Sequence, residues 1–312
     1  MKICFIDAGI FIEKKELLNP LREIGEIDIY EGIPDSVEEV IKRGKEAEVI
    51  AFGLMQFTNE MIDHLPNLKL LQFIGTGVWN FVDVDYARSK GIEVRNIEGY
   101  GSNAVAEFAV AAGLSAARKI PAADRVLKTG GWSIDGLKGM EIKDSVVGVV
   151  GTGSIGRLVA EKYAALGAKV IACDIFENDQ LKRDFHVEYL SMEEVFRRAD
   201  LITLHMKATK ENEHCINEKL FNLMKNGAVF VNAARAELVD HNALYEALDS
   251  GILGAAAVDV YNCEPPAEED YRFACRENVI ATPHIGYYTQ QANDNSIIMT
   301  TESILQAVGR IK

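Results

Sequence analysis

Three polar residues in the second half of the sequence have the types and positions needed for acid–base chemistry on a small anion. Arg235, Glu264 and His284 each follow closely on the end of a predicted β-strand. The carboxyl ends of parallel strands meet at one edge of a sheet, where such sheets bind ligands, so the three side chains can converge there. Each alone has an ordinary alternative: a surface cation, a solvated turn residue and a ring bonded to a backbone carbonyl. Their occurrence at three strand ends favours the chemical interpretation.

Together these residues suit the interconversion of a 2-oxo acid and a 2-hydroxy acid. Arg235 presents a planar fork of donors that can bind the carboxylate and ketone oxygens of a 2-oxo acid. As a hydride reaches the carbonyl carbon, negative charge grows on the oxygen, and a protonated His284 can supply the proton. Glu264 beside it would favour the charged ring and fix its orientation. In the direction of oxidation, a neutral His284 would remove the hydroxyl proton.

A glycine-rich turn predicts the cofactor that this chemistry needs. The segment GTGSIG places Gly151, Gly153 and Gly156 between a strand of β-branched residues and a helix. The first glycine permits a tight turn, the second lets a pyrophosphate approach the backbone, and the third lets the helix pack on the strand. The helix start presents N–H groups to the phosphates. Asp174, at the end of the next strand, can accept hydrogen bonds from the adenosine ribose and would repel a 2′-phosphate, which predicts NAD rather than NADP.

Asp259 is a further acid at a strand end. It closes the apolar run before VYNCEPP. We interpret it as a buried acid that contacts the carboxamide of the nicotinamide, and the alternative is a helix-capping or turn acid.

The elements that must position these residues alternate along the whole chain. Short apolar runs separated by amphipathic segments are typical of parallel sheets covered by helices. A long alanine-rich helix, 103–119, separates two such series, either as a core helix or as a helix at a domain crossing or dimer contact. A last helix is predicted over 289–312, and a return of this helix to the first domain is compatible with the pattern. The predicted strands are 3–7, 26–30, 49–53, 70–75, 93–96, 145–151, 169–174, 201–206, 228–233, 254–260 and 278–282.

Composition excludes several other classes of function. The 312 residues carry a formal net charge of −14, which argues against nucleic acid as a partner. No window approaches the length of an uncharged membrane span, and MKICFID reads as a first strand rather than a signal peptide. The five cysteines have no CxxC spacing, so we expect free thiols, no metal site and a cytoplasmic location.

With these features, the sequence resembles the D-isomer-specific 2-hydroxyacid dehydrogenases. This family includes phosphoglycerate dehydrogenases, hydroxypyruvate reductases and D-lactate dehydrogenases. The resemblance implies that Arg235, Glu264 and His284 are catalytic and that the backbone of Gly75, Thr76 and Gly77 binds the substrate carboxylate. It also implies that Ser154, Ile155, Asp174, Ala233, Arg235, Asp259 and His284 line the NAD site. The segments that carry it are IGTGVWNFVDVD, AVAEFAVAAGLSAAR, VGVVGTGSIGRLVA, LITLHM, VNAARAELVD, AAVDVYNCEPP and TPHIGYYT.

The resemblance further implies an α/β fold of two doubly wound parallel-sheet domains. A Rossmann NAD-binding domain, 101–287, would be inserted in a flavodoxin-like substrate domain made of 1–100 and 288–312. The family usually forms homodimers through the NAD domains. Trp79, Lys207 and Ala236 depart from its pattern, at positions where an acid, a proline and a glycine are usual. The alternative function is that of the family's corepressor relatives, which are NAD-sensing binding proteins.

Overall fold

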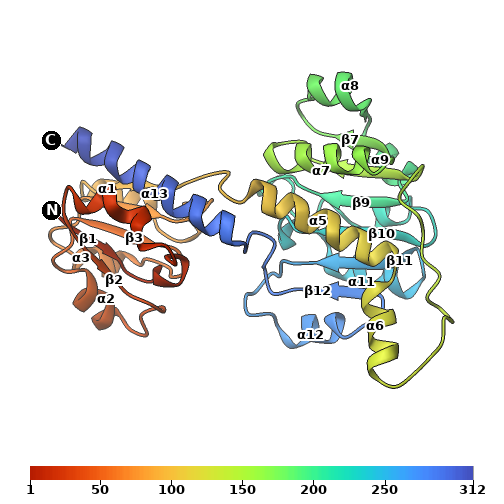
Figure 1. Ribbon diagram of the computed structural model, residues 1–312, viewed down its shortest axis with the longest axis horizontal. Coiled ribbons are helices and arrows are strands. Elements are labelled where there is room, and N and C mark those ends of the chain that lie inside the picture. Colours follow the sequence, from red (N-terminus) through yellow and green to blue (C-terminus); the bar gives the residue numbers. More distant parts are fainter. Residues whose placement is uncertain (312) are drawn as a thin grey trace. The chain divides into compact units, whose positions relative to one another are not determined.

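The computed structural model describes residues 1–311, and the chain forms two compact units (Figure 1). The first unit is Met1–Gly101 together with the C-terminal segment from Tyr288, and the second is Ser102–Tyr287. Each unit is built on its own parallel sheet. The predicted fold class, two doubly wound parallel-sheet domains, is confirmed.

The first unit has a five-stranded sheet in the order β2-β1-β3-β4-β5, in which every pair is parallel. A buried acid fixes its carboxyl edge: Asp7, just after β1, accepts hydrogen bonds from the N–H groups of Gly53, Leu54 and Met55, which follow β3. The strands are β1 Lys2–Phe5, β2 Glu26–Ile29, β3 Val49–Phe52, β4 Leu70–Phe73 and β5 Glu93–Arg95. The helices are η1 Gly9–Phe11, η2 Lys15–Leu18, α1 Asn19–Arg22, α2 Val37–Gly44, α3 Asn59–Asp63, η3 Val78–Asn80, α4 Val84–Ser89 and α13 Gln290–Ile311.

The C-terminal helix α13 belongs to this first unit although it follows the second unit in sequence (Figure 1). Polar groups attach it there: the hydroxyl of Ser303 donates to Gln72 Oε1 of β4 at 2.6 Å, and its carbonyl accepts from Arg95 Nη1 at 3.0 Å. Ile297, Ile304 and Ala307 are fully buried on the same helix. The chain therefore passes out of the first unit and returns to it.

The second unit has a seven-stranded parallel sheet in the order β12-β11-β10-β9-β6-β7-β8. The strand order reverses between β6 and β9, and in sheets of this type ligands bind at the carboxyl ends beside such a reversal. The strands are β6 Val146–Val150, β7 Lys169–Cys173, β8 Glu188–Tyr189, β9 Leu201–Leu204, β10 Ala228–Asn232, β11 Leu253–Val258 and β12 Val279–Ala281. The helices are α5 Ser102–Ala117, α6 Ile120–Lys128, α7 Ser154–Ala165, α8 Asp179–Phe185, α9 Met192–Arg198, α10 Glu218–Phe221, η4 Ala236–Leu238, α11 His241–Asp249 and α12 Glu268–Ala274.

The alanine-rich helix α5 is a core helix of the second unit, which is the ordinary one of the two interpretations. It packs against α7 and over β10 and β11. Its small residues are needed there, because a Cβ added at Gly113 would lie 2.2 Å from the hydroxyl oxygen of the fully buried Tyr163 on α7. Since this face is covered within the chain, it does not itself provide a contact for a second copy.

All predicted strands are present, and one further strand, β8, was not predicted. β8 has two residues at the sheet edge, too few for a periodic pattern. None of the helices within residues 1–311 combines the length and the hydropathy that a membrane-spanning helix needs. The same residues contain no cluster of His, Cys, Asp and Glu that could hold a metal, and all five cysteines are free.

Candidate active site

The three predicted catalytic residues follow three adjacent strands of the second sheet. Arg235 comes after β10, Glu264 after β11 and His284 after β12. These strands are neighbours in the order β12-β11-β10 and all run parallel. Their carboxyl ends therefore lie at one edge, as the sequence predicted.

His284 and Glu264 form a hydrogen-bonded pair. The ring nitrogen Nδ1 of His284 lies 2.8 Å from Oε2 and 3.0 Å from Oε1 of Glu264. An ionised carboxylate can only accept, so Nδ1 carries the hydrogen and donates it. The other ring nitrogen, Nε2, is then the one able to exchange a proton with a ligand. About two fifths of each side chain is exposed, 39% and 40%, which leaves the ring accessible.

The electrostatics of Glu264 keep it in the charged form. Burial acts to raise the pKa of its carboxyl group. The hydrogen bond and charge of His284, the N–H of Tyr261 and the positive charge of Arg235 outweigh burial, and the pKa lies below its usual value of 4.5. Glu264 is thus a carboxylate at neutral pH, and Arg235 is near enough to act on it.

Arg235 is held at the strand end by a residue that the sequence did not single out. The side chain of the buried Asn232 donates to the Arg235 carbonyl at 2.9 Å and accepts from the N–H of Ala234 at 3.0 Å. One guanidinium nitrogen of Arg235, Nη1, donates to the Ala234 carbonyl at 2.7 Å. The Arg235 side chain is exposed, so its donor fork is accessible to an anion.

Asp259 holds the loop that carries His284. Its buried carboxylate, 2% exposed, accepts from the Thr282 hydroxyl at 2.6 Å and from the N–H groups of Ile285 and Gly286 at 2.9 and 2.8 Å. His284 has a left-handed φ of 54°, a costly conformation for a residue with a Cβ, and these bonds maintain it. Asp259 therefore acts as the turn acid that was its alternative interpretation. One acceptor position remains on Oδ2, so its contact with a carboxamide stays a prediction.

The glycine-rich turn has the shape of a pyrophosphate cradle. Gly151 has a φ of +88°, and a Cβ there would lie 2.7 Å from the N of Met206. A Cβ at Gly156 would lie 1.9 Å from the Gly151 carbonyl oxygen, whereas the space beside Gly153 is open. Gly153 caps α7 without a side-chain hydrogen bond, so the N–H groups of the first turn, which contains Ser154, can bind an anion. The residues present thus fit a dinucleotide phosphate.

The other predicted cofactor residues lie around this turn. Asp174, exposed after β7, accepts from the N–H of Thr152 at 2.5 Å and of Phe176 at 3.0 Å. Ile155 lies in the first turn of α7, and Ala233 directly follows β10. All of these positions are at the carboxyl edge of the second sheet.

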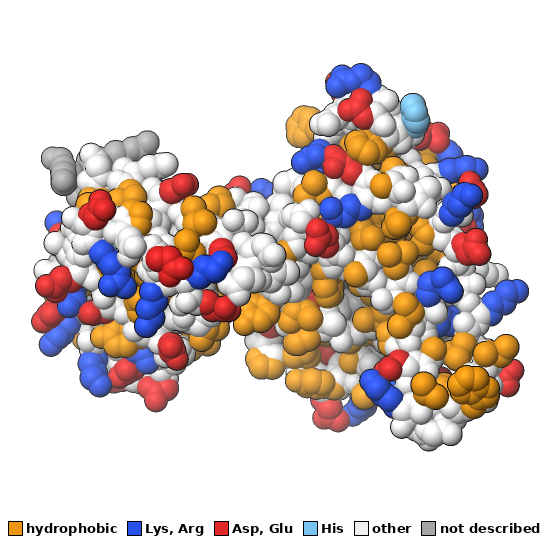
Figure 2. Space-filling model, in the orientation of Figure 1, with side chains coloured by type: hydrophobic (Ala, Val, Ile, Leu, Met, Phe, Trp, Pro, Cys, Tyr) orange, Lys and Arg blue, Asp and Glu red, His pale blue; other side chains and the backbone are white. Residues whose placement is uncertain are grey.

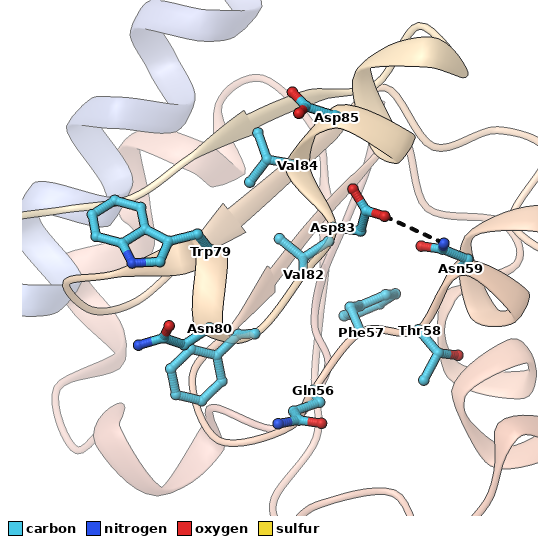
Figure 3. Close-up of a pocket in the computed structure, with 11 residues that line it drawn as sticks. Gln56, Phe57, Thr58, Asn59, Trp79, Asn80, Val82, Asp83, Val84 and Asp85 are labelled. Carbon is cyan, nitrogen blue, oxygen red and sulfur yellow. Dashed lines mark hydrogen bonds between the residues drawn. The ribbon is translucent and has the colours of Figure 1, made fainter. Parts of the chain in front are cut away.

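The predicted carboxylate loop lies in the first unit, directly after β4. Gly77, the N-cap residue of η3, has a φ of +87°, and the Thr76 hydroxyl donates to the Ile97 carbonyl at 3.3 Å. Next to this loop is a hollow of about 590 Å³, whose wall includes Asn59, Asp83 and Trp79 (Figure 3). Trp79 is 64% exposed, and its indole extends away from the Asn59–Asp83 side of the hollow (Figure 3).

The chain is similar to known oxidoreductases. A family described as "D-isomer specific 2-hydroxyacid dehydrogenase, NAD binding domain" matches residues 110–286. The hydroxypyruvate reductase of Thermotoga maritima is 37% identical over 274 residues, which cover 87% of this chain and 88% of that protein. The D-3-phosphoglycerate dehydrogenase of Methanocaldococcus jannaschii is 36% identical over 292 residues, 93% of this chain but only 55% of that protein.

The fold is also shared with solved structures. The structure of D-lactate dehydrogenase from Aquifex aeolicus complexed with NAD and lactic acid superimposes with a TM-score of 0.83. The two sequences are 29% identical, and the superposition covers 99% of this chain and 96% of the chain of the A. aeolicus enzyme. The similarity therefore includes both units and not the glycine-rich turn alone.

Proposed function

Because this chain belongs to the D-isomer specific 2-hydroxyacid dehydrogenase family, we propose that it interconverts a 2-oxo acid and the corresponding D-2-hydroxy acid, with NAD as its cofactor. The observation that carries the proposal is the pair of His284 and Glu264 beside the charge of Arg235. An acid–base histidine with a charged partner and a neighbouring cation suits reversible reduction of a carbonyl next to a carboxylate.

The proton moves through His284 in this proposal. NAD, when bound, supplies or accepts the hydride at the substrate carbon. His284 gives a proton from Nε2 to the substrate oxygen during reduction and takes it back during oxidation. Glu264 accepts the Nδ1 hydrogen throughout, so it stabilises the charged ring and keeps Nε2 directed toward the substrate.

Substrate oxygens are bound by positive charge and by backbone donors. The guanidinium of Arg235 binds the carboxylate and ketone oxygens through its fork of N–H groups. The backbone N–H groups of Gly75, Thr76 and Gly77 bind the carboxylate, and the left-handed φ of Gly77 supports this by turning the chain sharply at the loop.

For the cofactor, we assign the phosphates to the turn of Gly151, Gly153 and Gly156 and to the first N–H groups of α7. Asp174 would bind the adenosine ribose. Ser154, Ile155, Ala233 and Asp259 complete the proposed NAD site.

A homodimer is part of the proposal, with contacts that include α6 and the segment after it. Leu127, Trp132 and Ile134 are large apolar residues exposed to 63%, 93% and 87%. Figure 2 shows hydrophobic side chains on the surface over this region. A second copy would remove them from water, so we expect a dimer by light scattering and a shift toward monomer in Trp132→Glu.

The free cysteines, two of them exposed, support the cytoplasmic location that we also propose.

The activity is tested by following NADH oxidation with pyruvate, glyoxylate, hydroxypyruvate, 2-oxoglutarate and 2-oxoisocaproate. We expect turnover of at least one of them, and its loss in His284→Ala with NADH binding retained. His64→Ala, which changes a histidine of the first unit, is the control. Failure to reduce any 2-oxo acid, or full turnover in His284→Ala, would contradict the proposal.

The alternative of an NAD-sensing binding protein finds no support in the relatives described above, whose names are those of enzymes.

A further inference from the structure

A directed chain of hydrogen bonds ends on Asp174. The backbone nitrogen of Asn178 lies 3.0 Å from the Tyr189 hydroxyl oxygen. The same hydroxyl oxygen lies 2.9 Å from Thr152 Oγ1. Thr152 Oγ1 in turn lies 3.2 Å from Asp174 Oδ2. The backbone N–H can only donate and the carboxylate can only accept, so the two hydroxyl groups between them have a fixed order. Tyr189 accepts from Asn178 and donates to Thr152, and Thr152 donates to Asp174.

The carboxylate at the end of this chain has little freedom left. Oδ2 accepts two hydrogen bonds from Thr152, one from its hydroxyl and one from its N–H at 2.5 Å, and Oδ1 accepts from the N–H of Phe176 at 3.0 Å. An exposed aspartate without such partners samples several rotamers. Here both oxygens are tied to the backbone, and one acceptor position remains on Oδ1.

Three strand ends contribute to the arrangement. Thr152 is in the turn after β6 and is only 5% exposed, Asp174 follows β7, and Tyr189 is in the edge strand β8. The Tyr189 ring lies beneath the ammonium group of Lys182 at 5.6 Å, which keeps the phenol in place. The short strand β8 therefore has a consequence for the cofactor site.

We propose that Thr152 and Tyr189 are positioning residues that make the site select NAD over NADP. They fix the open acceptor position of Asp174 for one hydroxyl group of the adenosine ribose. They also fix its negative charge where a 2′-phosphate would come, so the carboxylate cannot turn away from that phosphate. This inference rests on the assigned NAD site and does not depend on which 2-oxo acid is the substrate.

The test is the substitution Thr152→Val, which keeps the shape and the backbone N–H but removes the hydroxyl group. Dissociation constants for NADH and NADPH are measured by titration calorimetry on the full chain. We expect the NADH Kd to rise about fivefold, which is within the range of the net contribution of one ordinary hydrogen bond. We expect the preference for NADH over NADPH to fall by at least as much, and Thr152→Ser to restore both values.

Tyr189→Phe provides a second measurement. It leaves the Thr152 hydroxyl in place but removes its donor, so a smaller loss of preference in the same direction, about twofold, is expected. Tyr271→Phe, at an exposed tyrosine of α12, is the matched control and should change neither Kd. An unchanged NADH-to-NADPH preference in Thr152→Val overturns the proposal, and if that variant does not fold, an unchanged preference in Tyr189→Phe does so. If no 2-oxo acid is reduced but the preference shifts as described, the catalytic proposal fails and this one stands.

Discussion

Glu264→Gln tests whether a charged partner is what makes His284 an effective acid. Both carboxylate oxygens lie within hydrogen-bonding distance of His284 Nδ1, at 3.0 and 2.8 Å. Glutamine has nearly the same shape, and its amide oxygen can still accept from the ring. The substitution therefore removes the negative charge and one of the two acceptor oxygens, and keeps the other.

The expected magnitude follows from the exposure of the pair. A hydrogen bond involving a charged group contributes about 1.5–3 kcal/mol when solvent is excluded. Because 40% of the Glu264 side chain is exposed, screening favours the lower end, about 1.5 kcal/mol. If the transition state of reduction loses this stabilisation of about 1.5 kcal/mol, kcat/KM falls about tenfold.

The assay is kcat/KM for NADH-dependent reduction of the best 2-oxo acid, measured from pH 4 to pH 9 in both proteins. The pKa of Glu264 is lowered below 4.5, so the carboxylate is charged throughout the neutral range. The wild-type advantage should therefore be present above about pH 4.5 and be lost as the pH falls through the lowered pKa. The tenfold difference should accordingly be found at neutral pH and shrink only below pH 4.5.

Glu194→Gln is the matched control, since it changes a glutamate on α9 that pairs with Arg197 outside the site. It should leave kcat/KM unchanged. Equal kcat/KM of wild type and Glu264→Gln at pH 7 would refute the role given to the carboxylate.

Three further predictions concern the second unit. Asp259→Asn must turn an amide N–H toward a backbone N–H, so stability should fall by about 1–3 kcal/mol and kcat by about tenfold. The NADH Kd should also rise, because Asp259 is part of the proposed NAD site, and an unchanged Kd would limit its role to holding the loop. Gly113→Ala should lower the free energy of unfolding in urea by about 2 kcal/mol, and adding Tyr163→Phe should restore it. The control Gly309→Ala, where the added Cβ has open space, should lose no stability. Equal destabilisation of both alanine variants would contradict the crowding at Gly113. Burial lowers the pKa of His205 to about 3, so the free energy of unfolding of the wild type should fall as the pH drops from 6.5 toward 3. In His205→Gln this fall should be less steep. An equally steep fall in the variant would exclude His205 as its cause.

The sequence was sufficient for the fold and for the positions of Arg235, Glu264 and His284 at adjacent strand ends, because both depend on local patterns. Apolar runs located the long strands, and the residues after β10, β11 and β12 had to share an edge once those strands were parallel. The glycine spacing similarly located the turn before α7, because glycine is required there by steric crowding within a few residues.

The remaining parts of the site depend on partners that are distant in sequence. Asp259 was recognised as a strand-end acid, but its bonds to Thr282 and Gly286 cross to another strand end and have no local signal. The chain of bonds from Tyr189 through Thr152 likewise needs a two-residue strand that has no periodicity. Hydrogen-bonded networks of this kind become visible only when the tertiary structure is known.

The path of the chain between its two units has a consequence for the order of folding during synthesis. The second unit, Ser102–Tyr287, is one continuous segment, whereas the first unit also needs α13, which the ribosome makes after that segment. We expect the NAD-binding unit to be able to fold while the first unit, although translated earlier, still lacks the helix that binds Gln72 and Arg95. The N-terminal sheet would thus become complete only after the NAD-binding unit has been synthesised.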